Sequence, residues 1–383
     1  MSAPLRLALH FICYFGWAGI MLPFFPVYLD AKGLSGTEIG ILLGIGPWAR
    51  FAVNPLVGPL ADRRGVIREL IIGASLLAGV GLGLYLAADA FAALLLAGVL
   101  VGLGTAPIVP LGDALAIRFA AAGLIDYSRV RLCGSIAFIG TTLLGGAILA
   151  ELGVISIPIS ALALWVVGIG VAAALPAPPP GPAEEEAARK TAASRVVLAR
   201  PGVLRFILAA TCLVSSHAVV YHFGTLHFRA VGVDDATIGL LWSIGVVFEI
   251  ALFAVGDRIF ERIRPIQLLR LAAIGGVLRW TLLAEVSSVP LLFFAQSLHA
   301  LTFAASHLGA LGFVARRIPE KSTATGLLSA LGSGLGMAVL VPISGVLYDA
   351  FGGGAFYAAT TLSAVAALLL FTIPTVPPTR TPA

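Results

Sequence analysis

The chain has 383 residues, of which 59% are hydrophobic and only 11% are charged. Roughly a quarter of the residues of a soluble domain are charged, so this chain lacks the polar residues that a soluble surface of this size needs. The net charge of +5 does not indicate nucleic acid, because the charges lie in short clusters between apolar blocks rather than on one face. The composition therefore indicates a protein of the lipid bilayer with no nucleic-acid partner.

Apolar blocks long enough to cross a bilayer recur along the whole chain. A spanning helix needs about 20 residues. Blocks of that size occupy residues 7–29, 39–61, 70–88, 90–119, 130–149, 154–175, 203–228, 236–256, 266–284, 290–314, 324–347 and 351–373. The first block is longer than the core of a signal peptide, so we interpret it as a spanning helix. The sequence predicts an all-α membrane protein of twelve transmembrane helices.

A polar segment divides the predicted helices into six and six. Residues 176–200 are rich in proline and charge, so they suit neither lipid nor a hydrophobic core. The two sides also repeat: Ile-Gly-Ile-Leu at 39–42 matches Ile-Gly-Leu-Leu at 238–241, and at the same offset Arg50 falls on Glu249. We expect a six-helix half at 1–175, a cytoplasmic linker at 176–200 and a second half at 201–383, as in many secondary transporters.

Arginine and lysine gather on one side of the predicted helices. With the N-terminus inside, the inner loops contain most of them: Arg63, Arg64, Arg68, Arg118, Arg129, Arg258, Arg262, Arg264, Arg316, Arg317 and Lys321. The outer loops contain only Lys32 and Arg229 and are otherwise acidic. The positive-inside rule then places both termini in the cytoplasm. Because arginine far exceeds lysine and alanine and glycine are abundant, we expect the inner membrane of a bacterium.

Five charged residues fall inside or at the start of predicted helices, where each costs at least ~2.5–3.5 kcal/mol on insertion scales. They are Arg50, Asp113, Arg131, Glu249 and Arg279. Such residues usually face a bundle interior or an aqueous cavity, so we expect the five to line a central cavity. The alternatives are an ion pair that only fixes helix packing, a loop position for Arg131, and an Arg279 side chain that extends to the membrane surface.

A polar stripe follows the tenth predicted helix. Gln296, His299, Phe303 and His307 are spaced by three, four and four residues, so they share one face. The seventh predicted helix adds Ser215, Ser216, His217 and His222. A histidine can titrate near neutral pH, which suits proton handling; the alternative is a histidine that only packs.

The sequence lacks the motifs that are typical of several other classes of protein. The three cysteines, Cys13, Cys133 and Cys212, lie in or beside apolar blocks and have no zinc or disulfide spacing. The sequence also has no nucleotide-binding loop, metal cluster, nucleophile motif or soluble domain. We therefore expect no enzyme, no cofactor and no metal site.

Residues 58–65, Gly-Pro-Leu-Ala-Asp-Arg-Arg-Gly, follow the second predicted helix and resemble the signature loop of the major facilitator superfamily. The resemblance implies a transporter of two six-helix halves. It also implies a gate at Asp62 and Arg63, in which Asp62 closes the second helix against the N-terminus of the eleventh. A helix N-terminus favours a carboxylate there. The alternative is an ordinary charged turn.

Most of both halves is similar to the lactose permease and phenylpropionate permease families. Residues 19–26 resemble the end of the first helix, residues 126–131 (Asp-Tyr-Ser-Arg-Val-Arg) resemble a Glu-Phe-Gly-Arg-Ala-Arg motif, and residues 297–301 and 345–349 also fit. The resemblance implies that Arg131 binds substrate, paired with Asp113. It further implies that Arg279, His299 and Glu249 belong to the linked sites of a proton symporter.

Three departures separate the chain from the lactose permease family. Thr302 stands where that family has the glutamate central to proton coupling, Phe138 stands where it stacks a tryptophan on sugar, and Arg50 has no charged counterpart. Arg50, the Leu-Arg-Trp run that contains Arg279, and the histidines of the tenth helix are closer to the phenylpropionate permease family. That family implies small aromatic acids as substrates.

We therefore expect a proton-coupled symporter that imports a small organic solute such as 3-phenylpropionate by alternating access. Arg131 or Arg50 would hold the substrate carboxylate, because a guanidinium binds it through two hydrogen bonds. Glu249 would carry the proton, with His299 as its partner or substitute.

Other functions stay open at this stage. One is a symporter of sugars or nucleosides, and another is a drug exporter of the same fold. A membrane sensor or enzyme is a third, of a different class. The partners expected are a small molecule, protons and the bilayer, and because the fold usually works as a monomer, we expect a monomer here.

Overall fold

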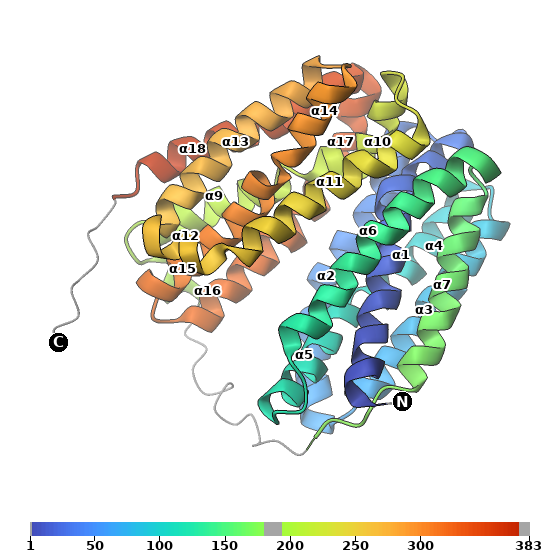
Figure 1. Ribbon diagram of the computed structural model, residues 1–383, viewed down its shortest axis with the longest axis horizontal. Coiled ribbons are helices and arrows are strands. Elements are labelled where there is room, and N and C mark those ends of the chain that lie inside the picture. Colours follow the sequence, from blue (N-terminus) through green and yellow to red (C-terminus); the bar gives the residue numbers. More distant parts are fainter. Residues whose placement is uncertain (1, 180–193, 375–383) are drawn as a thin grey trace.

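The computed structural model describes residues 2–179 and 194–374, except for the side chains of Asp62, Arg63, Ser194, Asp257, Phe260, Glu261 and Ser322. Every regular element in these residues is a helix (Figure 1). The N-terminal helices are α1 (Ala3–Ala31), α2 (Gly36–Arg64), α3 (Ile67–Ala87), α4 (Phe91–Thr105), α5 (Ile108–Ala121), α6 (Tyr127–Leu152) and α7 (Ser156–Ala173). The C-terminal helices are α8 (Ser194–Leu198), α9 (Val203–Ser215), α10 (Ala218–Ala230), α11 (Asp235–Ala254), α12 (Gly256–Arg262), α13 (Pro265–Glu285), α14 (Val289–Ser297), α15 (Ser306–Arg317), α16 (Lys321–Leu328), α17 (Met337–Phe351) and α18 (Phe356–Phe371).

The predicted twelve-helix membrane fold is confirmed. Eleven stretches of the described chain are long and apolar enough to cross a bilayer, and the last, Thr323–Phe371, has 49 residues. This last stretch contains two of the predicted helices, because the 3₁₀ turn Gly352–Ala355 joins α17 directly to α18. The predicted linker, residues 176–200, falls largely outside the described residues.

Breaks or π-helical stretches interrupt four of the helices that the sequence predicts as continuous. The segment 90–119 divides into α4 and α5 at Ala106 and Pro107, and the segment 203–228 divides into α9 and α10 at Ser216 and His217. Proline has no backbone N–H, so the break at Pro107 sacrifices no hydrogen bond of its own. The π-helical stretches η2 (Ala300–Ala305) and η3 (Ser329–Gly336) lie within the tenth and eleventh predicted helices. Such stretches inside helices often mark functional sites.

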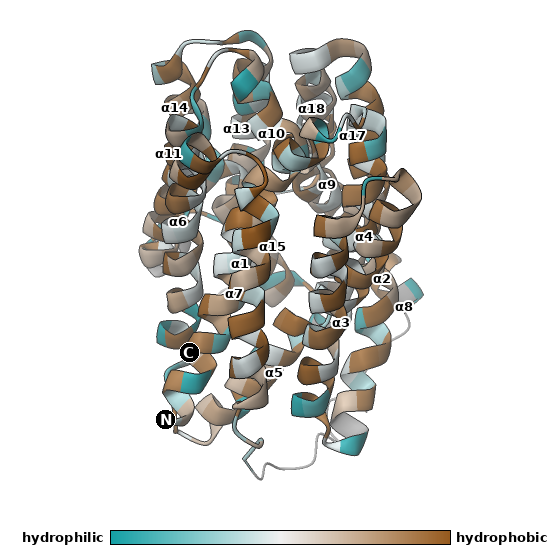
Figure 2. Ribbon diagram, turned by 90° about the vertical axis from the view of Figure 1, so that its right-hand side faces the viewer, coloured by the Kyte–Doolittle hydropathy of each residue, from teal (hydrophilic) through white to brown (hydrophobic). Residues whose placement is uncertain are grey.

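The helices form two bundles, α1–α7 and α9–α18, each packed chiefly on itself. Side chains such as Leu56, Leu144 and Leu368 are 71%, 61% and 71% exposed. In water such exposure would be costly, but in a bilayer these side chains meet lipid tails. Figure 2 shows hydrophobic residues along the length of the bundle and hydrophilic residues concentrated toward its two ends.

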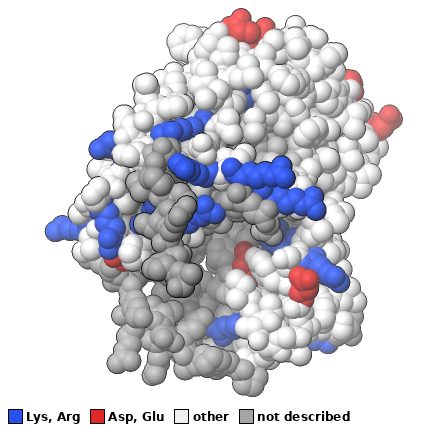
Figure 3. Space-filling model, turned by 60° about the vertical axis from the view of Figure 1, so that its left-hand side comes forward, with Lys and Arg blue, Asp and Glu red and all other residues white. Residues whose placement is uncertain are grey.

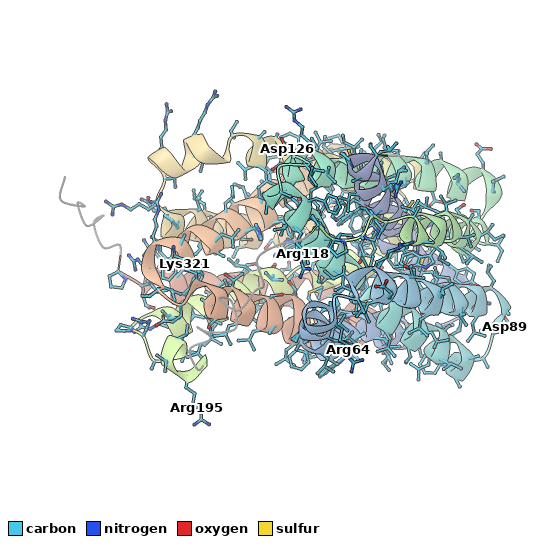
Figure 4. The ribbon with its side chains drawn as sticks, turned by 90° about the horizontal axis from the view of Figure 1, so that it is seen from below. Arg64, Asp89, Arg118, Asp126, Arg195 and Lys321 are labelled. Carbon is cyan, nitrogen blue, oxygen red and sulfur yellow. The ribbon has the colours of Figure 1, made fainter. Side chains whose placement is uncertain are left out.

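Basic side chains gather at one end of the molecule. Figure 3 shows Lys and Arg side chains crowded on a face that includes this end, and Figure 4 shows Arg64, Arg118 and Arg195 well separated from Asp89 at the opposite end. We call the end with Arg64, Arg118 and Arg195 the linker end, because the chain leaves α7 and enters α8 there. The end with Asp89 is the distal end.

The two bundles meet closely toward the distal end and separate toward the linker end. Their main contacts join α2 to α17 and η3, α6 to α11, and α1 to α10. Two of these contacts bring backbones together at glycine: a Cβ on Gly345 would lie 2.2 Å from Gly36 O, and a Cβ on Gly146 would lie 2.5 Å from Asp235 O. Among the described residues, α5, α12, α15 and α16 make no extensive contact with the opposite bundle, and Figure 1 shows α5 and α16 apart.

Candidate functional site

Arg279 is the most deeply buried charge in the described part of the chain, at 2% exposure on α13. Its Nη1 donates to His299 Nδ1 at 3.0 Å and to Thr302 Oγ1 at 2.7 Å, and its Nη2 donates to Gln296 Oε1 at 2.9 Å. The guanidinium carbon also lies 4.5 Å from the centre of the Trp280 ring. Gln296 belongs to α14, Thr302 belongs to η2, and His299 immediately precedes η2, so this predicted cavity residue is held by neutral groups of one neighbouring helical segment.

The π-helical stretch explains how one helix presents three acceptors to one guanidinium. Gln296 ends α14 and Thr302 lies in η2, whose wider turn shifts the following residues relative to α14. Farther along, the Phe303 ring stacks on His299 at 5.2 Å and on His307 at 6.4 Å between centroids. The polar stripe predicted for this helix therefore divides into a part that binds Arg279 and a part that forms a ring stack.

The contacts of His299 define its tautomer. An arginine can only donate, so Nδ1 of His299 must accept from Arg279 and carry no hydrogen. The hydrogen of the neutral ring is then on Nε2, which lies 3.2 Å from Glu249 Oε2 on α11. His299 thus connects the buried cation to the carboxylate of Glu249, and adding a proton at Nδ1 would require the bond to Arg279 to break.

His217 extends the same network on its other side. Its Nδ1 lies 3.0 Å from Leu213 O, so Nδ1 must donate, and its Nε2 accepts from the Thr302 hydroxyl at 3.2 Å. Thr302 therefore accepts from Arg279 and donates to His217 with one hydroxyl group. The result is a directional chain from Arg279 through Thr302 and His217 to the end of α9.

The N-terminal half has a second cluster of charge, around Asp113 and Arg131. Arg131 Nε lies 3.8 Å from Asp113 Oδ1, and the Tyr127 hydroxyl donates to the same oxygen at 3.1 Å. The guanidinium of Arg131 rests on the Phe15 ring, 3.9 Å from its centre. Both charged side chains keep more than a quarter of their surface exposed, so hydrogen-bonding capacity remains for a ligand.

Arg50 is unlike the other charges inside the helices. It lies near the middle of the span Gly36–Ala61, its side chain is exposed, and it has no hydrogen bond or ion pair to any described residue. It acts electrostatically on Tyr14 of α1 and on His222 of α10, which belongs to the other half. This position suits a cavity between the halves, where water can solvate the guanidinium, better than contact with lipid.

The two clusters belong to opposite halves and interact electrostatically. Arg131 of the N-terminal half contributes to the electrostatic environment of Glu249 in the C-terminal half, as does His307. The structure therefore brings together Asp113 and Arg131, joins Glu249, His299 and Arg279, and gives Arg50 no direct partner among the described side chains. The side chains of Asp62 and Arg63, the predicted gate, lie outside the described residues, although their backbone continues α2.

Some contacts of this site had no signal in the sequence. Phe15 is one of many aromatic residues in the chain, and nothing in its neighbours indicates that it supports Arg131. Tyr127 occurs in a motif, but its bond to Asp113 depends on how α5 and α6 pack. The pairing of Thr302 with His217 would have required the register shift of η2 to be known.

Comparison with known proteins identifies the class. Residues 5–359 match the model of the MFS_1 like family. A "Probable 3-phenylpropionic acid transporter" of Escherichia coli is 32% identical over 378 residues, which is 97% of each chain. A maltose permease of Geobacillus stearothermophilus is 28% identical over 371 residues, covering 94% of this chain and 92% of the permease. The chain therefore belongs to the MFS_1 like family of major facilitator transporters.

Solved structures agree on the fold. The nucleoside transporter NupG superposes with a TM-score of 0.83 at 16% identity, covering 97% of this chain and 98% of NupG. A D-xylose–proton symporter superposes with a TM-score of 0.71 at 15% identity, covering 98% of each chain. The protein is thus a multi-pass membrane transporter of the major facilitator fold, and its relatives are transporters rather than enzymes.

Proposed function

We propose that this protein is a proton-coupled symporter that imports a small organic anion, with aromatic carboxylates such as 3-phenylpropionate as the substrate class. The observation that carries the proposal is the pairing of two unlike clusters: accessible arginines on one half, and a carboxylate joined to a histidine on the other. A guanidinium with free donors suits a substrate carboxylate, and a carboxylate–histidine pair suits a proton.

Arg131 is the proposed anchor for the substrate carboxylate. Its only carboxylate partner among the described residues is Asp113, and their separation of 3.8 Å exceeds a hydrogen bond. Its guanidinium is backed by Phe15, which fixes the plane of the donors while leaving their edge free. Arg50 supplies a second positive charge near the boundary between the halves. The Phe15 ring beside Arg131 suits the aromatic part of such an acid.

Glu249 is the proposed proton carrier. Its bond to His299 is charge-assisted only while Glu249 is ionised, and charge-assisted bonds are about twice as strong as neutral ones. Protonation of Glu249 therefore loosens its link to His299 and, through it, to Arg279. This gives the proton a way to alter how α11 is held against α13 and α14.

Electrostatics can couple the two events. Arg131 attracts both a charged Glu249 and a bound substrate carboxylate, so the two anions would repel one another around the same cation. A proton on Glu249 removes that repulsion. Substrate and proton would then occupy the transporter together, which is the requirement for symport.

The distribution of charge between the two ends of the molecule supports an orientation in the membrane. The linker end is rich in arginine and the distal end in carboxylates, so we assign the linker end to the cytoplasm of a bacterial inner membrane. The halves, 1–175 and 201–383, would move against one another about the central site, with Asp62 and Arg63 gating the linker end. We expect the monomer to be the working unit.

The test is proton movement into proteoliposomes that contain the purified protein and an internal pH dye, with no imposed gradient. Phenylpropionate, a galactoside and a nucleoside would be added in turn. Because neutral phenylpropionic acid also crosses lipid unaided, protein-free liposomes and liposomes with Arg131→Gln provide the baseline. Acidification by phenylpropionate above both baselines is expected. Exchange of labelled phenylpropionate without excess acidification would contradict proton coupling, and absence of both would contradict the substrate class.

Sugar–proton symport is the second candidate. Asp113, which accepts from Tyr127, is a suitable acceptor for sugar hydroxyl groups, and the maltose permease is similar over most of the chain. A galactoside or maltose signal in the same proteoliposomes, with phenylpropionate silent, would favour it.

A further inference from the structure

The distal end of the molecule carries a contact between the halves that the proposed function does not use. Asp349, near the end of α17, reaches the first turn of α2 in the opposite half. Its Oδ1 accepts from Gly36 N at 2.6 Å, and its Oδ2 accepts from Thr37 N at 2.7 Å and from the Thr37 hydroxyl at 2.6 Å. One carboxylate thus receives three hydrogen bonds across the boundary.

The start of α2 depends on both halves for its hydrogen bonds. The first backbone N–H groups of a helix have no partner within the helix. In α2, Glu38 N donates to Ser35 Oγ in the same half, whereas Gly36 N and Thr37 N donate to Asp349. The helix dipole also favours a negative charge at this point. The N-terminus of α2 is therefore capped partly from its own chain segment and partly from the other half.

The surrounding backbone is shaped to let the carboxylate in. A Cβ on Gly36 would lie 2.5 Å from Asp349 Oδ1 and 3.1 Å from Gly345 O, and a Cβ on Gly40 would lie 3.0 Å from the Gly345 Cα. Side chains at these positions would force α2 and α17 apart. The three glycines and Asp349 therefore form one closely fitted contact.

We propose that Asp349 is a latch that holds the distal end closed. Any opening of the distal end must separate α17 from α2, and the three hydrogen bonds then break together because one side chain makes them all. The latch adds a defined energetic step to the transition and biases the protein toward the form that is open at the linker end. The proposal rests on alternating access, but its test needs no substrate.

The test measures distances between spin labels at the distal end by double electron–electron resonance. Labels at Glu151→Cys in the N-terminal half and Ser287→Cys in the C-terminal half would be attached after the three native cysteines are replaced, because all three are free thiols. Asp349→Asn removes the charge, and Asp349→Ala removes the acceptors. Asp234→Asn is the matched control, because Asp234 caps its own helix by accepting from Thr237 N at 2.9 Å.

Asp349→Ala is expected to raise the ratio of long to short distances about tenfold, because charge-assisted bonds at a helix N-terminus are lost. Asp349→Asn should have a smaller effect in the same direction, and Asp234→Asn should match the parent. Gly36→Ala, which acts on the partner side, should also lengthen the distances. Distributions for Asp349→Ala that match the parent would overturn the latch. A failure of the substrate panel would leave these distances unaffected, so the two proposals fail separately.

Discussion

The two halves hold their intramembrane arginines in opposite ways. Arg279 in the C-terminal half is enclosed and donates to three neutral acceptors, whereas Arg131 in the N-terminal half has one distant carboxylate and an exposed edge. An arginine that the protein encloses can position its neighbours but offers a ligand no accessible donor; the Nε of Arg279 has no partner among the described residues, but it is buried. An arginine with free donors is costly until a ligand arrives. In the proposed function, this contrast assigns proton handling to the C-terminal half and substrate binding to the N-terminal half.

Replacing Arg131, whose donors are accessible, should have the largest effect on substrate binding. Arg131→Gln is expected to weaken binding of phenylpropionate about 10- to 100-fold, because a charged hydrogen-bonding group contributes about 1.5–3 kcal/mol. Binding would be measured by titration of the purified protein. Arg129→Gln is the control, since the Arg129 side chain lies two residues away, is 87% exposed and, within the described part of the chain, forms an ion pair with Asp126 alone. Equal affinities for Arg131→Gln and Arg129→Gln would remove Arg131 from the substrate site.

A substitution at Arg50 tests whether the N-terminal half has a second arginine that binds the substrate carboxylate. We expect Arg50→Gln to weaken binding about three- to tenfold, less than Arg131→Gln, because Arg50 is more exposed and its charge is better screened. Arg64→Gln, at the linker end of the same helix, should leave affinity unchanged. If Arg50→Gln weakens binding more than Arg131→Gln does, the substrate carboxylate binds to Arg50 instead.

Mutations in the hydrogen-bond network of Arg279 should change the stability of the protein rather than its affinity for substrate. Thr302→Val leaves an Arg279 N–H and His217 Nε2 without their shared partner, so the free energy of unfolding is expected to fall by about 1–3 kcal/mol. Denaturant unfolding in detergent would measure it. Thr361→Val is the control, because that exposed hydroxyl donates to Tyr357 O in its own helix and has no other bond to a described residue. An unfolding free energy unchanged by Thr302→Val would mean that the hydroxyl is not needed in the network.

The smallest expected effect lies outside the membrane, at Glu320. Arg200 donates to Glu320 at 2.9 Å, and this hydrogen bond lowers the pKa of Glu320. A lowered folded-state pKa stabilises the fold above the unfolded value of about 4.3, and that stabilisation is lost as the pH falls through the folded value. Glu320→Gln should therefore lower the melting temperature slightly at pH 7 and have less effect near pH 3. Glu151→Gln, at an exposed position of the distal end, should leave the melting temperature unchanged at both pH values. An effect of Glu320→Gln that does not depend on pH would contradict the ion pair.

The sequence predicted the fold better than the site. The length of the apolar blocks and the excess of arginine in the loops on one side are strong signals, because the bilayer imposes them on every spanning helix. The polar linker is equally plain in the sequence. The intramembrane charges were found for the same reason, since each is too costly to be incidental. The pairings of Arg131 with Asp113 and of Glu249 with His299 were expected from the family resemblance. The bonds of His217 with Thr302 and of Asp349 with Gly36 were not predictable, because they depend on helix breaks, π-helical register and close glycine packing. These features are set by tertiary contacts rather than by local pattern.

The central claim is that the C-terminal half handles the proton through Glu249, and one paired measurement tests it most directly. Wild-type and Glu249→Gln proteoliposomes would be assayed for exchange of labelled phenylpropionate and for proton-driven accumulation of the same substrate. The account predicts that Glu249→Gln keeps exchange within about threefold of wild type, because the open arginines are intact, and loses accumulation. Accumulation by Glu249→Gln at the wild-type level would contradict the assignment of the proton to Glu249.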